Sequence, residues 1–145
     1  MRSLVLVLIL FANFAFAENL IVVVSKDNPY TDLKLDEINN IYLGKMNHWP
    51  KGQRVLAVDL PNSTKAKKLF LENVVEMTPI SFEAHWGKIQ SSGQAFPLQK
   101  FKTTEEVKKY LSENIYAIAY LLESDLDESF KKIKIDGEEV ITPLK

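Results

Sequence analysis

The residues best suited to chemistry in this sequence cluster where a helix is expected to begin. Asn62, Ser63 and Thr64 stand just before residues with helical spacing, and Lys65 and Lys67 follow them. The first amides of a helix lack internal partners, and the helix dipole favours negative charge there. Two hydroxyl groups and two ammonium groups would add hydrogen bonds and positive charge. The sequence therefore predicts a candidate anion-binding site at these five residues.

A purely structural role is the alternative for the same residues. Asn62 or Ser63 would then cap the helix, and the two lysines would lie on its solvated face. One helix terminus contributes only about 0.3–1 kcal/mol toward a nearby charge. Micromolar affinity needs about 8 kcal/mol. Tight binding would therefore require several charge-assisted bonds in a cleft that a dimer or a partner completes.

Other patterns argue against catalysis. The chain has no cysteine, which excludes thiol catalysis, disulfides and structural Cys-zinc sites. Its two histidines, His48 and His85, do not have the short spacing of a metal-ligand pair. A Gly-x-Ser-x-Gly elbow, a P-loop and a glycine-rich dinucleotide turn are all missing from the sequence. We therefore predict no enzyme activity, no catalytic residue, no metal site and no cofactor.

Length and charge narrow the class of protein further. The 145 residues carry a net charge of -1, and 46% are hydrophobic and 26% charged. These values are typical of one ordinary globular domain. A dedicated nucleic-acid binder would usually show a clear basic excess. The composition therefore favours a single domain with no nucleic-acid partner, and it leaves the oligomeric state open.

The first residues have the pattern of an export signal. Arg2 supplies a positive charge, Leu4 to Ala12 is an unbroken apolar run, and Ala15-Phe16-Ala17 has the small-x-small pattern of a cleavage site. The apolar run is shorter than the roughly 20 residues of a membrane span. We expect residues 1–17 to be a signal peptide and 18–145 to be one periplasmic domain. An uncleaved anchor or a buried strand is the alternative.

Strand and helix patterns alternate along the rest of the chain, which predicts an α/β domain with a mixed sheet. Apolar runs predict strands at Leu20–Val24, Val55–Val58 and Ile115–Leu122. Helical spacing predicts helices over Leu35–Tyr42 and Ala66–Met77. Two further helices are expected to begin at the Thr78-Pro79 pair and at a Thr103/Glu106 capping box. Ser91–Gln94 is predicted to be a loop. Asp136-Gly137, between Ile133–Ile135 and Val140-Ile141, predicts a hairpin.

Trp49 permits two interpretations. It lies in the turn Trp49-Pro50-Lys51-Gly52. An exposed aromatic side chain in a turn can anchor a partner protein. Alternatively, the indole folds back and joins the core.

The order of several motifs resembles a known family. These motifs are Val22-Val23-Val24 with Asn28-Pro29, Tyr42-Leu43-Gly44-Lys45, Trp49 to Gly52, Asp59-Leu60-Pro61, and Ala117-Ile118-Ala119-Tyr120. Together they are similar to the phosphate-type periplasmic substrate-binding proteins of ABC transporters. The resemblance covers nearly all of residues 18–145, and it corresponds to one lobe, the second, of a two-lobed protein.

This resemblance implies a three-layer lobe of the type 2 periplasmic-binding-protein kind, with helices flanking a mixed sheet. Family members hold phosphate partly through a Ser-Gly-Thr turn at a helix start and a nearby arginine. Asn62 to Thr64 stand at that turn without its glycine, and Lys67 stands roughly at the arginine. The implied function is non-catalytic binding of phosphate or a related oxyanion. The alternative is a ligand-free interaction module that contacts an envelope or transporter membrane protein.

Overall fold

Strand β1 (Leu20–Ser25) lies inside the central sheet, and all six of its residues are buried. This burial on both faces is what its run of β-branched residues predicts. The computed structural model describes residues 18–141. The expected signal peptide, residues 1–17, lies outside the described residues, as do residues 142–145.

The central sheet is mixed, as predicted. Its strand order is β4-β3-β5-β1-β6, and the remaining strands are β3 (Leu56–Asp59), β4 (Gln99–Lys100), β5 (Ala117–Leu122) and β6 (Phe130–Lys132). Strand β3 runs parallel to both β4 and β5, whereas β1 runs antiparallel to β5 and β6. Parallel pairing places the carboxyl ends of β3 and β4 side by side, which becomes important for the candidate site.

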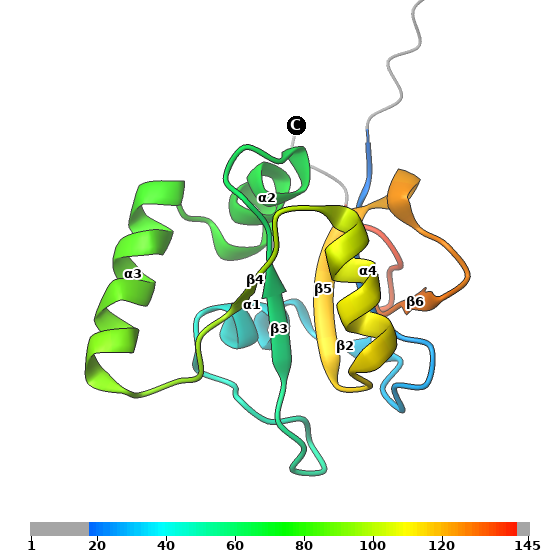
Figure 1. The fold of residues 1–145 in the computed structure, drawn as a ribbon, viewed down its shortest axis with the longest axis horizontal. Coiled ribbons are helices and arrows are strands. Elements are labelled where there is room, and N and C mark those ends of the chain that lie inside the picture. Colours follow the sequence, from blue (N-terminus) through cyan, green and yellow to red (C-terminus); the bar gives the residue numbers. More distant parts are fainter. Residues whose placement is uncertain (1–17, 142–145) are drawn as a thin grey trace, which may run out of the picture.

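Helices cover the sheet and complete the predicted α/β architecture. They are α1 (Leu35–Tyr42), α2 (Lys65–Phe70), a π-helical turn η1 (Leu71–Val75), α3 (Pro79–Ser92), α4 (Thr104–Glu113) and a short 3-10 turn η2 (Glu123–Asp125). Figure 1 shows α4 in front of the sheet and α1 behind it. Behind the sheet, the ring of Tyr120 packs 4.1 Å from that of Phe70 and 5.6 Å from that of Tyr42, so α1 and α2 share one layer. No helix within residues 18–141 is long and apolar enough to cross a membrane.

Several local predictions are confirmed by the helix ends. Thr78 caps α3, with Pro79 as its first residue, and Thr103 with Glu106 forms the capping box of α4. Gly93 adopts the left-handed conformation that ends α3. Because α3 continues to Ser92, the loop predicted from Ser91 begins two residues later.

Helix α2 departs from its prediction at both ends. Its cap is Thr64, whose hydroxyl accepts a hydrogen bond from the Lys67 amide, so a cap at Asn62 or Ser63 is wrong. The helix changes to a π-helical turn at Leu71, and Glu76 then takes a left-handed conformation. A π turn accommodates an extra residue, and a hydrophobic period of 3.6 does not reveal it. The regular helix predicted to Met77 therefore ends early.

The predicted terminal hairpin is reduced to a single residue pair. Ile135 bridges Glu138 across the Asp136-Gly137 turn. Strand β7 (Lys134–Ile135) instead pairs in parallel with β2 (Asp32–Leu33). Ile141, the last described residue, pairs with Leu20 of β1 rather than with the strand before the turn.

Trp49 belongs to the core. Its side chain is 1% exposed, its ring stacks 4.6 Å from that of Tyr30, and its indole N–H donates to the Tyr116 carbonyl. The interpretation of Trp49 as an exposed anchor for a partner is therefore wrong.

Two glycines at helix ends provide a matched test of the packing. Gly44 and Gly93 have φ angles of +72° and +66°. A Cβ atom at Gly44 would lie 2.9 Å from the Ala95 Cβ, whereas one at Gly93 would meet nothing within 4 Å. We expect Gly93→Ala to lower the free energy of unfolding by about 1 kcal/mol through backbone strain alone. Gly44→Ala should cost roughly 1–3 kcal/mol more through overpacking. Urea denaturation measures both, and equal losses would contradict the close approach at Gly44.

Candidate functional site

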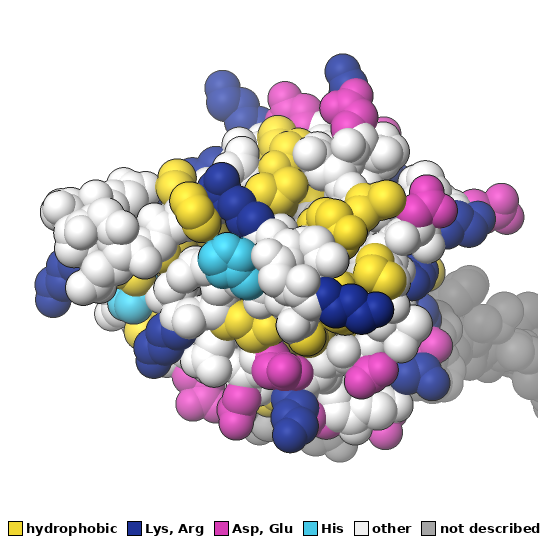
Figure 2. Space-filling view, turned by 90° about the horizontal axis from the view of Figure 1, so that it is seen from below, with side chains coloured by type: hydrophobic (Ala, Val, Ile, Leu, Met, Phe, Trp, Pro, Cys, Tyr) yellow, Lys and Arg dark blue, Asp and Glu magenta, His cyan; other side chains and the backbone are white. Residues whose placement is uncertain are grey.

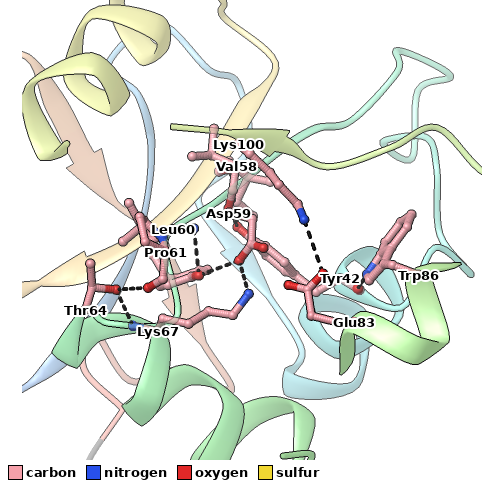
Figure 3. A network of polar contacts seen from close by, with 12 residues as sticks. Tyr42, Val58, Asp59, Leu60, Pro61, Thr64, Lys67, Glu83, Trp86 and Lys100 are labelled. Atoms are coloured by element: carbon pink, nitrogen blue, oxygen red, sulfur yellow. Dashed lines mark hydrogen bonds and ion pairs between the residues drawn. The ribbon is translucent and has the colours of Figure 1, made fainter. Parts of the chain in front are cut away.

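A buried carboxylate ends strand β3. Asp59 is 2% exposed, and its Oδ1 accepts a hydrogen bond from the Tyr120 hydroxyl at 2.6 Å. The same oxygen pairs with the Lys67 ammonium group from α2 (Figure 3). The Tyr120 hydroxyl in turn accepts a hydrogen bond from the Leu60 amide at 3.0 Å. This network connects β3, β5 and α2 at one point.

Lys67 is the unexpected member of this network. It is 1% exposed, and its ammonium group lies 4.2 Å from the centre of the Phe82 ring, close enough for a cation–π contact. Burial lowers the pKa of Lys67, and the Asp59 carboxylate opposes that shift. The interpretation of Lys67 as part of a solvated face is wrong. Its spacing from Phe70 and Val74, which are buried, was the available signal that it lies on the inner face of the helix.

The start of α2 is only partly open. The Thr64 amide and hydroxyl both donate to the Pro61 carbonyl, at 3.0 and 2.8 Å. The amides of Lys65 and Ala66 have no hydrogen-bond partner among the described residues. The first turn of the helix therefore leaves the amides of Lys65 and Ala66 open, whereas the Thr64 amide is already bonded.

The remaining predicted site residues lie on the surface of the same turn. Asn62 and Ser63 are exposed. The Lys65 ammonium group lies 2.8 Å from the Glu18 carboxylate, and both side chains are about half exposed. Lys65 and Lys67, although only two residues apart, thus have opposite surroundings: one is at the surface and the other is buried under the turn.

A cavity of about 300 Å³ opens beside this turn, at the carboxyl ends of β3 and β4. It is lined by Asp59, Leu60, Pro61, Asn62, Glu83, Lys100, Phe101 and Lys102. Of the five predicted site residues, only Asn62 lines it. The sequence prediction missed Lys100 and Lys102, because the two-residue strand β4 has no recognisable pattern and is placed beside Asp59 only by the sheet pairing.

The charges around the cavity are largely compensated. Asp59 pairs with Lys67, and Glu83 lies 3.3 Å from the Lys100 ammonium group. The Lys102 ammonium group makes no ion pair within residues 18–141. The cavity therefore retains one positive charge, that of Lys102, without an ion-pair partner among the described residues.

The histidines do not form a second site. His85 contacts the Leu43 carbonyl through Nε2 at 2.9 Å, and His48 is exposed. The part of the chain that the structure describes contains no group of three or more metal-ligating side chains. Seen from below, the surface shows histidine and basic side chains scattered among hydrophobic ones rather than gathered around a hollow (Figure 2).

The buried tyrosines next to Asp59 predict a specific alkaline titration. Burial, followed by the Asp59 carboxylate, raises the pKa of Tyr42 and Tyr120 well above the usual value. The unfolded chain would lose these protons near pH 10. Because the folded state keeps them, the free energy of unfolding should fall as pH rises above about 10. Phenolate absorbance should therefore show two of the five tyrosines ionising only as the fold is lost.

Single replacements identify the two tyrosines that ionise only on unfolding. Tyr42→Phe and Tyr120→Phe should each reduce by one the number of phenolates that form in that transition. Ionisation of all five tyrosines with the native circular dichroism retained would contradict the burial of this network.

The fold is similar to that of solved phosphate receptors. An ABC-type phosphate transport receptor from Vibrio cholerae matches with a TM-score of 0.65 and 18% identity, over 82% of this chain and 46% of that one. A putative phosphate ABC transporter substrate-binding protein with bound phosphate, from Clostridium perfringens, matches with a TM-score of 0.68 and 23% identity over 84% and 46%. PstS from Borrelia burgdorferi matches with a TM-score of 0.62 and 12% identity over 83% and 48%.

These comparisons confirm the predicted resemblance at the level of the fold. No protein-family model matches the sequence, and the search of curated proteins gave no significant match. Two of the matched structures are described as a phosphate transport receptor and a putative substrate-binding protein. The chain spans less than half the length of these proteins. It therefore has the fold of a single lobe of a phosphate-type periplasmic substrate-binding protein.

Proposed function

We propose that this protein is a non-catalytic binding module that holds phosphate or a related oxyanion where β3 meets α2. One observation carries this assignment: the cavity with the unpaired Lys102 lies beside the turn that starts at Asn62 and leads to the open amides of Lys65 and Ala66. Solved proteins of the same fold include one described with bound phosphate.

The predicted site residues take different roles in this proposal. The Asn62 and Ser63 side chains and the amides of Lys65 and Ala66 would contact the anion directly. Lys65 would contribute its charge by exchanging Glu18 for the ligand, since that ion pair is exposed. Thr64 and Lys67 would position the turn without touching the anion, because Thr64 caps the helix and Lys67 is paired with Asp59. Lys100 and Lys102 join the set as cations from β4 and the loop after it.

The expected affinity is weak. A helix terminus contributes at most about 2 kcal/mol, and a hydrogen bond to a charged group about 1.5–3 kcal/mol. A terminus and one such bond together supply roughly the 4 kcal/mol that corresponds to a dissociation constant near 1 mM. The described residues form one lobe, and solvent is not excluded from the cavity by a second one, so larger gains are not expected from this lobe alone.

Export and a membrane partner belong to the same proposal. The pattern of residues 1–17 supports a periplasmic location. Two of the matched structures are described as parts of phosphate ABC transport systems, which supports an envelope or transporter membrane protein as partner.

An interaction module without a ligand is the second candidate. The 84% exposure of Ile80, close to the cavity residue Glu83 on α3, favours it.

A phosphate titration followed by amide NMR separates the two candidates. At constant ionic strength, phosphate should shift the amide signals of Ser63, Lys65, Ala66 and Lys102, with a midpoint of about 1 mM. Lys102→Ala and Ser63→Ala should each weaken binding about tenfold or more, which corresponds to the loss of one hydrogen bond to a charged group.

Lys134→Ala is the matched control, because Lys134 is also an exposed lysine but lies on β7, away from the cavity. The Lys134→Ala variant should bind phosphate with the same affinity as the unmodified protein. If tens of millimolar phosphate or sulfate leave these signals unmoved, oxyanion binding is refuted and the interaction module becomes the better assignment.

A further inference from the structure

A second hollow lies where η1 ends and α3 begins. The left-handed Glu76 turns the chain between these helices and leaves a cavity of about 430 Å³. Leu71, Met77 and Pro79 give it an apolar lining, and Lys68, Glu72 and Glu76 surround it. None of the three charged side chains forms an ion pair within residues 18–141.

The most exposed large hydrophobic side chain of the described residues stands next to this cavity. Ile80 is 84% exposed, and it directly follows Pro79, which lines the cavity. Figure 1 shows α3 at the left margin of the molecule, and the residues of its first turn, 79–81, are exposed. An apolar projection and an apolar hollow therefore adjoin on one face.

We propose that this face binds a second copy of the same chain. In a symmetric pair, each Ile80 would fill the cavity of the other copy, because a twofold axis makes every contact reciprocal. The surrounding charges fit such a pair. Lys68 of one copy can meet Glu72 and Glu76 of the other, whereas a face of one sign would repel itself.

The proposed face also lies close to the candidate anion cavity. Glu83, which lines the candidate anion cavity, lies one helical turn after Ile80 on α3. Self-association through Ile80 would bring the second copy close to that cavity. The association itself does not depend on anion binding.

Sedimentation analysis of the purified protein from micromolar to hundreds of micromolar concentrations tests this inference. A reversible monomer–dimer equilibrium is expected. Ile80→Asp should raise the dimer dissociation constant at least tenfold, because it places a charge in an apolar contact. Ile115→Asp is the matched control, since Ile115 is also exposed, at 42%, but lies before β5. It should leave the constant unchanged.

A charge exchange identifies the partner as a second copy of this face. Lys68→Glu alone, and Glu72→Lys with Glu76→Lys, should each give monomers, and an equimolar mixture of the two variants should regain dimers. Circular dichroism confirms that every variant is folded. A protein that stays monomeric at hundreds of micromolar, a dimer insensitive to Ile80→Asp, or a mixture that does not reassociate would each overturn the proposal.

Discussion

The ion pair between Lys67 and Asp59 fixes the geometry on which the candidate site depends. Two charges taken out of water are costly unless they are paired and further hydrogen-bonded. Here Asp59 also accepts from Tyr120, and Lys67 lies against the Phe82 ring. These contacts come from β3, β5, α2 and α3, so they hold four elements at one point. The first turn of α2 is thereby held at the carboxyl end of β3, where the cavity opens.

This arrangement decides which groups remain for a ligand. The ammonium group of Lys67 is already neutralised, and Thr64 serves as the helix cap. In the proposed binding mode, the contacts with the anion are therefore made by the surface of the turn and by Lys102, which the pairing of β4 with β3 brings to the cavity. Without an opposing wall, such a site is wet and weak. The exposed Ile80 and its neighbouring cavity form a separate face, the one that we propose for self-association.

Local chemistry made much of the fold predictable from the sequence. The β-branched run at Leu20–Val24, the Thr78-Pro79 start and the Thr103/Glu106 box each act over a few residues, and each is confirmed. Features set by distant contacts were missed. Lys100 lies beside Asp59 only because β4 pairs with β3, and the two residues are forty-one positions apart in the sequence. The π turn after Phe70 was missed because it leaves the hydrophobic pattern of the helix unchanged. Lys67 was misjudged because a lysine on a helix is usually solvated.

A double-mutant cycle on the buried pair tests the central claim most directly. Lys67→Met leaves the Asp59 carboxylate buried without its partner, and it should cost about 3–5 kcal/mol of unfolding free energy. Asp59→Asn likewise leaves the Lys67 ammonium group buried without its charged partner. Because the double variant removes both charges, it should be more stable than the sum of the single losses allows, by at least about 1.5 kcal/mol. Strictly additive losses in urea denaturation would show that the two side chains do not depend on each other, contrary to the role given to them here.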